Sequence, residues 1–279
     1  MKVTDIELHT ASATDFVTLS YRDLKHSNPY NIKNVSGLDA EDIISRYYPA
    51  SGPFKYYNLA LPTRTIVLNV SMNPRFSQGE TYSDLREALY KKILYVRQAT
   101  VSLWFKNGAT TVARVYGFIK KIEAPFFEKS PEVTITIECP DPMLKAPAAV
   151  NIDVNGLDPN NTLISDFLST APHGFWFQMT VLTAGDLTYT WKDPNDANWS
   201  FTVTVTSAFQ VNDIIQFSSE YGQKRLTLTR SGVTTSLANK IIPGSVWPIL
   251  FPGDNRIQVS NPTHLRWGII QHTPTYWGI

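Results

Sequence analysis

Histidine is the residue type in this chain best suited to hold a metal ion, because neutral imidazole is a common ligand of zinc and related metals. A helical zinc motif places two histidines four residues apart, and no pair here has that spacing. His264 and His272 could face each other across a strand pair, but two imidazoles without a third ligand are more often structural. We therefore predict no metal site. The five histidines are His9, His26, His173, His264 and His272.

Carboxylates and cysteine offer the other routes to catalysis. Two close carboxylates in a cleft could hydrolyse a glycosidic bond, but the candidate aspartates fall in predicted turns, where Asp commonly bonds to nearby backbone. Those aspartates are Asp153, Asp158, Asp166, Asp193 and Asp196. Cys139 ends an apolar strand far in sequence from any histidine, so we expect a buried hydrophobic side chain rather than a nucleophile. Phosphate-loop, dinucleotide, GxSxG and HExxH motifs are absent from the sequence. We predict no catalytic residue and no cofactor.

Composition narrows the classes of partner. The formal net charge is +1 at pH 7, which argues against a general nucleic-acid-binding protein. Charged residues make up 18% and aromatic residues 12%, a balance that suits either aromatic cores or surfaces buried against other proteins. The first ten residues lack the apolar segment of a signal peptide, and no stretch is long and apolar enough for a membrane helix. We expect no membrane partner and folding in a reducing cytoplasm.

Strand and helix patterns then divide the chain. Alternating apolar residues predict strands over 65–72, 99–106, 110–118 and 132–139, with a hairpin turn at Asn107-Gly108. One helix is predicted over 81–95, with Thr81 or Ser83 as its N-cap. Three prolines between 140 and 147 cannot continue a sheet ladder, so we place a domain boundary near residue 145. The two predicted domains are 1–145 and 146–279, and the sequence leaves open whether the last strand, 271–279, packs in the second domain or returns to the first.

The second half of the chain reads as almost entirely β. Eight short predicted strands, separated by turn signals such as Asn155-Gly156 and Asp193-Pro194, favour a β-sandwich. The segment 24–63, in the first half of the chain, is predicted to be a long loop rich in tyrosine.

Tryptophan side chains in the second half could stack on a sugar, or could fill a sandwich core, which we favour. They are Trp176, Trp191, Trp199 and Trp247.

Two stretches of sequence resemble the distal tail protein family of long-tailed phages. One runs from Tyr116-Gly117-Phe118-Ile119 through 133–137 to Cys139-Pro140-Asp141-Pro142. The other is 211–259, in which a hairpin precedes the turn Phe251-Pro252-Gly253-Asp254-Asn255, and the chain closes on an aromatic segment, 276–279. Each motif is mostly turn chemistry, so the resemblance depends on their order and spacing.

This resemblance implies a mainly β protein: an N-terminal β-sandwich or split-barrel domain with one α-helix, followed by a galectin-like β-sandwich. Family members form a homo-hexameric ring at the distal tail tip of the virion, assembled in the host cytoplasm. The first domain makes the ring, which joins the tail tube protein to the tail hub or tail-associated protein and lets DNA pass through its lumen. The tape measure protein and receptor-binding or fibre proteins are further partners implied by the family.

Within this framework we expect Tyr47, Tyr48, Tyr56 and Tyr57 to lie at subunit contacts, because a tyrosine-rich arm can reach a neighbour and bury its rings there. An alternative is a carbohydrate-binding module of a tail fibre or baseplate that takes part in host-cell recognition. A third hypothesis is a tail-associated hydrolase, but the sequence shows no acid–base pair that would support it.

Overall fold

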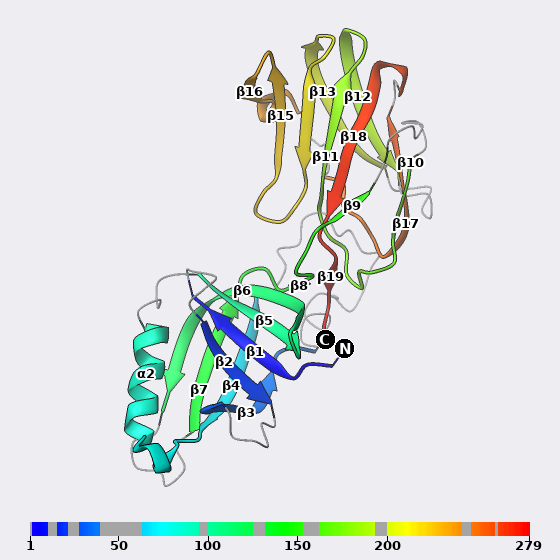
Figure 1. The fold of residues 1–279 in the computed structure, drawn as a ribbon. Helices are drawn as coiled ribbons and strands as arrows, with labels where there is room; N and C mark the ends of the chain where they lie inside the picture. Colours follow the sequence, from blue (N-terminus) through cyan, green and yellow to red (C-terminus); the bar gives the residue numbers. More distant parts are fainter. Residues whose placement is uncertain are drawn as a thin grey trace, which may run out of the picture. The chain divides into compact units, whose positions relative to one another are not determined.

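The structure is a computed structural model that describes residues 2–10, 16–21, 28–39, 63–94, 100–124, 132–152, 154, 162–192, 200–241, 247–259 and 262–279. Within these residues the chain forms two compact units (Figure 1). One unit contains 1–147 together with 276–279, and the other contains 148–275. The predicted domain bounds included 276–279 in the second domain, but the sequence left the placement of this last segment open; in the structure these residues belong to the first unit.

The first unit is built on a closed sheet (Figure 1). Seven strands pair in the ring order β6-β5-β1-β2-β3-β4-β7, and β7 pairs back onto β6. The described neighbours in the ring are antiparallel except β2 and β3, which are parallel. The strands are β1 (Asp5–His9), β2 (Phe16–Tyr21), β3 (Tyr30–Ser36), β4 (Arg64–Met72), β5 (Val101–Asn107), β6 (Thr110–Glu123) and β7 (Glu132–Cys139).

Alternation along these strands fills the inside of the ring. On β7 every second residue is buried, including Val133, Ile135 and Ile137, while the residues between them are half-buried. Cys139 completes this row as a fully buried side chain, as predicted, and burial raises the pKa of its thiol to about 12. A thiol with so high a pKa stays protonated near neutral pH and is a poor nucleophile.

The one α-helix among the described residues, α2 (Tyr82–Leu94), confirms the predicted helix; a short 3₁₀ turn, η1 (Phe76–Gln78), precedes it. Thr81 caps it: the Thr81 hydroxyl accepts a hydrogen bond from the Asp84 amide (3.2 Å), and the Asp84 carboxylate accepts one from the Thr81 amide (2.9 Å). Leu85, Leu89 and Ile93 bury one face of the helix in the barrel core. No helix that the structure describes has the length and apolar character needed to span a membrane.

Strand β6 closes the barrel by changing partner midway. Its first half pairs with β5 up to the Val101↔Gly117 pair, and its second half pairs with β7 from the Phe118↔Glu138 pair onward. A side chain at Gly117 would bring a Cβ within 2.7 Å of the Glu138 carbonyl oxygen and 2.9 Å of Cys139 Sγ. The two strands therefore approach each other at a distance that only glycine permits.

The C-terminal residues return to the first unit. Strand β19 (Thr275–Tyr276) pairs with β8 (Leu144–Lys145), which pairs with β6. Tyr276 and Ile279 pack against the barrel core. Buried Arg64 holds this arrangement from inside, because its guanidinium donates to the carbonyl oxygens of Pro142 (2.6 Å), Gly37 (2.7 Å) and Trp277.

The second unit consists of two antiparallel sheets in a sandwich-type fold (Figure 1). The six-stranded sheet has the order β16 (Val233–Ser236), β15 (Arg225–Arg230), β14 (Ile214–Ser218), β11 (Phe175–Val181), β18 (Leu265–His272) and β9 (Val150–Ile152). The four-stranded sheet has the order β10 (Thr162–Asp166), β17 (Gly253–Val259), β12 (Gly185–Lys192) and β13 (Ser200–Phe209). Two 3₁₀ turns, η2 (Ala238–Lys240) and η3 (Pro262–His264), complete the unit. Strands β10 and β16 were not predicted.

Asp213 holds the corner where the chain leaves β13 for β14. Its carboxylate accepts hydrogen bonds from the Gln210 amide (2.7 Å) and from Arg230 Nε (2.8 Å) and Nη2 (2.6 Å). The hydrogen bonds from Arg230 are the main cause of a lowered pKa of Asp213, and the Gln210 amide adds to the effect. This corner lies in the 211–259 segment that carries the family resemblance.

Substituting Gly117 by Ala should loosen barrel closure. We expect the free energy of unfolding to fall by about 2 kcal/mol or more, because the added methyl group overlaps backbone and side-chain atoms of β7. Gly108→Asn is the matched control: Gly108 lies in the β5–β6 turn with open space around it, and Asn tolerates its left-handed conformation. Urea denaturation of the full-length chain measures the free energy of unfolding of both variants. Equal losses in the two variants would contradict the assigned role of Gly117.

Replacing Asp213 by Asn should destabilise the chain by about 2 kcal/mol at pH 7, because Arg230 loses its charged partner. The folded-state pKa of Asp213 is lowered, so its contribution is fully present above about pH 4, the ordinary range for Asp, and is lost as pH falls through the folded-state value. The stability gap between the two proteins should therefore shrink at pH 3.

Urea denaturation at pH 7 and pH 3 measures this gap. Glu87→Gln is the control, because the exposed Glu87–Lys91 pair should contribute less than about 0.5 kcal/mol at either pH. A gap for Asp213→Asn that is unchanged at pH 3 would show that the carboxylate charge is not what stabilises this corner.

Candidate functional site

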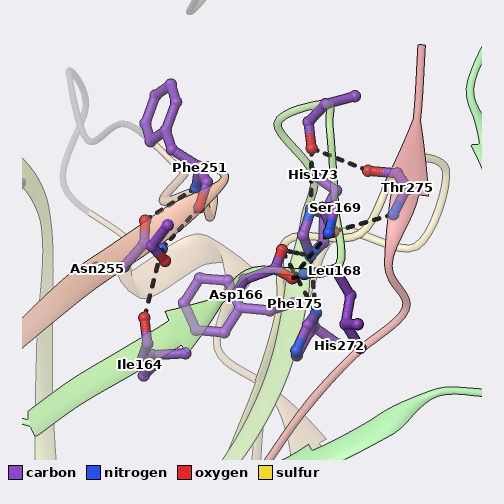
Figure 2. A network of polar contacts seen from close by, with 12 residues as sticks. Ile164, Asp166, Leu168, Ser169, His173, Phe175, Phe251, Asn255, His272 and Thr275 are labelled. Atoms are coloured by element: carbon purple, nitrogen blue, oxygen red, sulfur yellow. Dashed lines mark hydrogen bonds and ion pairs between the residues drawn. The ribbon is translucent and has the colours of Figure 1, made fainter.

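Three buried titratable side chains meet in the second unit (Figure 2). Asp166 and His173 are seven residues apart, and His272 comes from a segment 99 residues beyond His173. Asp166 ends β10, His272 ends β18, and His173 lies just before β11. Their exposed fractions are only 1%, 2% and 8%, respectively. Among the described residues this is the one group of three or more acidic, histidine or cysteine side chains with ligand atoms close enough to share a metal ion.

The polar atoms of the three side chains face one another. His173 Nε2 lies 3.0 Å from His272 Nδ1 and 3.5 Å from Asp166 Oδ2. His272 Nδ1 lies 3.9 Å from the same Asp166 oxygen. The two imidazole rings are stacked with their centroids 5.1 Å apart. One carboxylate oxygen and two imidazole nitrogens therefore form a compact triangle.

A shell of backbone and hydroxyl groups fixes the orientation of these side chains (Figure 2). Asp166 Oδ1 accepts hydrogen bonds from the amides of Leu168 (3.2 Å) and Ser169 (3.1 Å). His173 Nδ1 lies 3.3 Å from the carbonyl oxygen of Ala171, which it can reach only as a donor. Thr275 adds a bond from its hydroxyl to the same carbonyl (3.0 Å).

The turn at 250–255 bonds to His173 and to β10, the strand that ends at Asp166. His173 and Leu250 exchange both backbone hydrogen bonds, at 3.0 and 2.8 Å. Asn255 folds the turn by accepting from the Phe251 amide (2.9 Å), and it donates to the carbonyl oxygen of Ile164 in β10 (3.4 Å). The Phe251–Asn255 turn was recognised in the sequence as part of a family motif, and in the structure it supports the cluster.

Burial governs the electrostatics of the site. It lowers the pKa of His272, although the nearby Asp166 carboxylate opposes that effect. The imidazole of His272 is therefore neutral at pH 7. Asp166 Oδ2 is buried and accepts no hydrogen bond. The arrangement can bind a cation or share protons internally, but its burial keeps a polymer substrate away from it.

The sequence did not bring these residues together. From the sequence, His264 was a possible neighbour of His272 across a strand pair. In the structure His272 instead contacts His173, 99 residues away. The sequence also placed Asp166 in a turn, whereas Asp166 ends a strand that was not predicted. The short spacing between Asp166 and His173 is the one feature of the local sequence that relates to this cluster. It does not predict the cluster by itself, because His272 joins only when β18 pairs with β11.

Other predicted site residues can be placed only in part. Tyr47, Tyr48, Tyr56 and Tyr57 lie outside the described residues, as do His26, Asp153, Asp158, Asp193, Asp196 and Trp199. His9 is buried in the first unit, where its ring stacks on the rings of Phe16 and Trp104. Its Nε2 atom lies 2.9 Å from Glu7 Oε2. Trp247 stacks on buried Phe217 with centroids 4.9 Å apart, which is a core contact.

Comparisons with known proteins are informative about the fold. No protein-family profile and no curated protein sequence matches the chain. The solved structure of the Dit protein (gp 19.1) of phage SPP1, described as a paradigm of the hub adsorption apparatus in phages that infect Gram-positive bacteria, matches with a TM-score of 0.60 at 14% identity. The match covers 97% of this chain and 98% of that one.

Chains of the phage P2 baseplate in its activated conformation also match. The structure with Ca gives a TM-score of 0.42 at 9% identity over 100% of both chains, and the structure with Sr gives 0.40 at 10% identity over 97% and 98%. These scores are too low to support an argument by themselves. The likeness to the SPP1 protein extends over both units, and the chain therefore has the fold of a phage distal tail protein.

Proposed function

We propose that this chain is a structural protein of a phage tail, and that six copies form a ring at its distal end. The ring would join the tail tube protein to the tail hub and let DNA pass through its lumen. The observation that carries this proposal is the fold likeness to the SPP1 Dit protein, which extends over nearly the full length of both chains. The order of the two sequence motifs supports the same assignment.

The barrel surface has features that suit assembly. Strand β6 buries Val115 and Ile119 inside the barrel and directs Tyr116 and Phe118 outward, where these two rings are 42% and 43% exposed. Phe16, on β2, is a further partly exposed ring on this unit. Aromatic side chains are enriched at the centres of protein interfaces. A ring of identical subunits needs two different complementary surfaces on each subunit, and the outer face of β6 is suited to be one of them.

The proposed partners follow from this role: further copies of the chain, the tail tube protein and the hub or tail-associated protein. The tape measure protein and receptor-binding or fibre proteins would be neighbours in the assembled tail. The proposed location is the distal tip of the virion tail, after assembly in the host cytoplasm. The role requires no catalysis, cofactor or membrane contact.

Light scattering of the purified full-length chain tests the assembly. A closed hexamer would have a mass of about 188 kDa, six times the 31.4 kDa of one chain. Replacing Tyr47, Tyr48, Tyr56 and Tyr57 together by alanine should shift the mass toward that of the monomer while the circular dichroism spectrum is unchanged, because these tyrosines are proposed to lie at subunit contacts.

The matched control is Tyr221→Ala, which removes a 52% exposed tyrosine from the second unit and should leave the hexamer intact. A four-tyrosine variant that still assembles normally would contradict the proposed contact. A wild-type monomer that binds sugars on an array would instead favour a carbohydrate-binding module.

A further inference from the structure

We propose that Asp166, His173 and His272 bind one divalent transition-metal ion of the zinc class, which links three segments of the second unit. This inference is independent of the proposed role in the tail. It departs from the expectation drawn from sequence, because the spacing of histidines along the chain could not reveal a site built from β10, β18 and the segment before β11.

The positions of the donor atoms fit such an ion. Zinc bonds of about 2.0–2.1 Å in a tetrahedral arrangement place ligand atoms roughly 3.3 Å apart. The three separations in the cluster are 3.0, 3.5 and 3.9 Å, which bracket that value. Side-chain shifts of a few tenths of an ångström would therefore complete the geometry.

The hydrogen bonds around the cluster orient the three side chains so that their donor atoms face one another. His173 Nδ1 donates to the Ala171 carbonyl, so the lone pair of this ring is on Nε2, which points at the other two side chains. Asp166 Oδ1 is held by two backbone amides, which directs Oδ2 toward the histidines. Second-sphere bonds of this kind are typical of histidine and carboxylate metal ligands.

The unpartnered carboxylate oxygen is the strongest argument for a cation. A hydrogen bond from His272 Nδ1 to His173 Nε2 could satisfy the two rings without an ion. It would leave Asp166 Oδ2, which is buried and accepts no hydrogen bond, as an uncompensated polar atom. A divalent cation between the three atoms compensates all of them at once.

The donor set selects the class of ion. Two imidazole nitrogens and one carboxylate oxygen suit Zn²⁺ and its neighbours in the transition series. Ca²⁺ requires six to eight oxygen ligands and Mg²⁺ an octahedron of oxygens, which this set does not supply. The fourth tetrahedral position falls to a water molecule. Because all three side chains are buried, the ion would stabilise the fold rather than act on a substrate.

Metal analysis of the full-length chain without a histidine tag tests this inference. After treatment with a chelator, the protein is dialysed against Zn²⁺, Co²⁺ or Ca²⁺ and bound metal is measured by mass spectrometry. We expect one Zn²⁺ or Co²⁺ per chain, no Ca²⁺, and the visible absorption of tetrahedral Co²⁺. Zinc at a hundredfold excess over its dissociation constant should raise the melting temperature by about 5 °C or more.

The variants His173→Gln and Asp166→Asn should lose the bound ion, the Co²⁺ absorption and the thermal shift. His264→Gln is the matched control, because His264 is a half-buried histidine of the same unit outside the cluster, and this variant should keep all three signals. The wild-type measurements decide the matter even if a cluster variant fails to fold.

Two results would overturn the inference. One is a wild-type chain that takes up no Zn²⁺ or Co²⁺ and shows no thermal shift, which would make the cluster a metal-free polar network. The other is equal metal binding by a folded His173→Gln variant and by the wild type, which would locate the ion elsewhere.

Discussion

Strand β6 is the element on which the first unit depends, because it must pair with β5 along one half and with β7 along the other. A sheet that closes on itself leaves no free edge at the join. The close approach of β6 and β7 at Gly117 makes the closure possible, since any larger residue would contact the Glu138 backbone. The same strand carries β8 and, through it, β19 from the C-terminus. One residue without a side chain thus determines where the barrel closes.

At two other places, buried polar side chains join segments that are far apart in the sequence. Arg64 gathers three backbone carbonyl oxygens from separate parts of the first unit, including that of Trp277 near the C-terminus. In the second unit, Asp166 organises the loop after β10 through two backbone amides and faces the two histidines. Burying a polar atom is costly unless it is hydrogen-bonded, so Arg64 and Asp166 Oδ1 each tie together the segments that supply their partners. Arg64 and Trp277 are more than 90 positions apart in the sequence, and so are Asp166 and His272.

Local sequence patterns predicted some local structure but missed strands β1, β2, β3, β10 and β16; β3 lies within the segment 24–63 that was predicted to be a loop. The helix was found from Leu85, Leu89 and the cap at Thr81, and the β5–β6 hairpin from Asn107-Gly108, because in each case the interacting residues are within a few positions of one another. The motifs at 116–119 and 251–255 marked glycine and asparagine positions whose roles became clear only in three dimensions. The closure of β6 onto β7, the return of 276–279 and the meeting of His173 with His272 depend on strand pairing over long separations, which periodicity does not encode.

The central claim is that copies of this chain surround a passage at the end of a phage tail. Cryo-electron microscopy of the purified chain, alone and together with the tail tube protein, tests it most directly. We predict a six-fold ring in which the barrels of 1–147 border an open lumen wide enough to admit duplex DNA. A particle without such a lumen, or a chain that stays monomeric even with the tube protein present, would contradict the account.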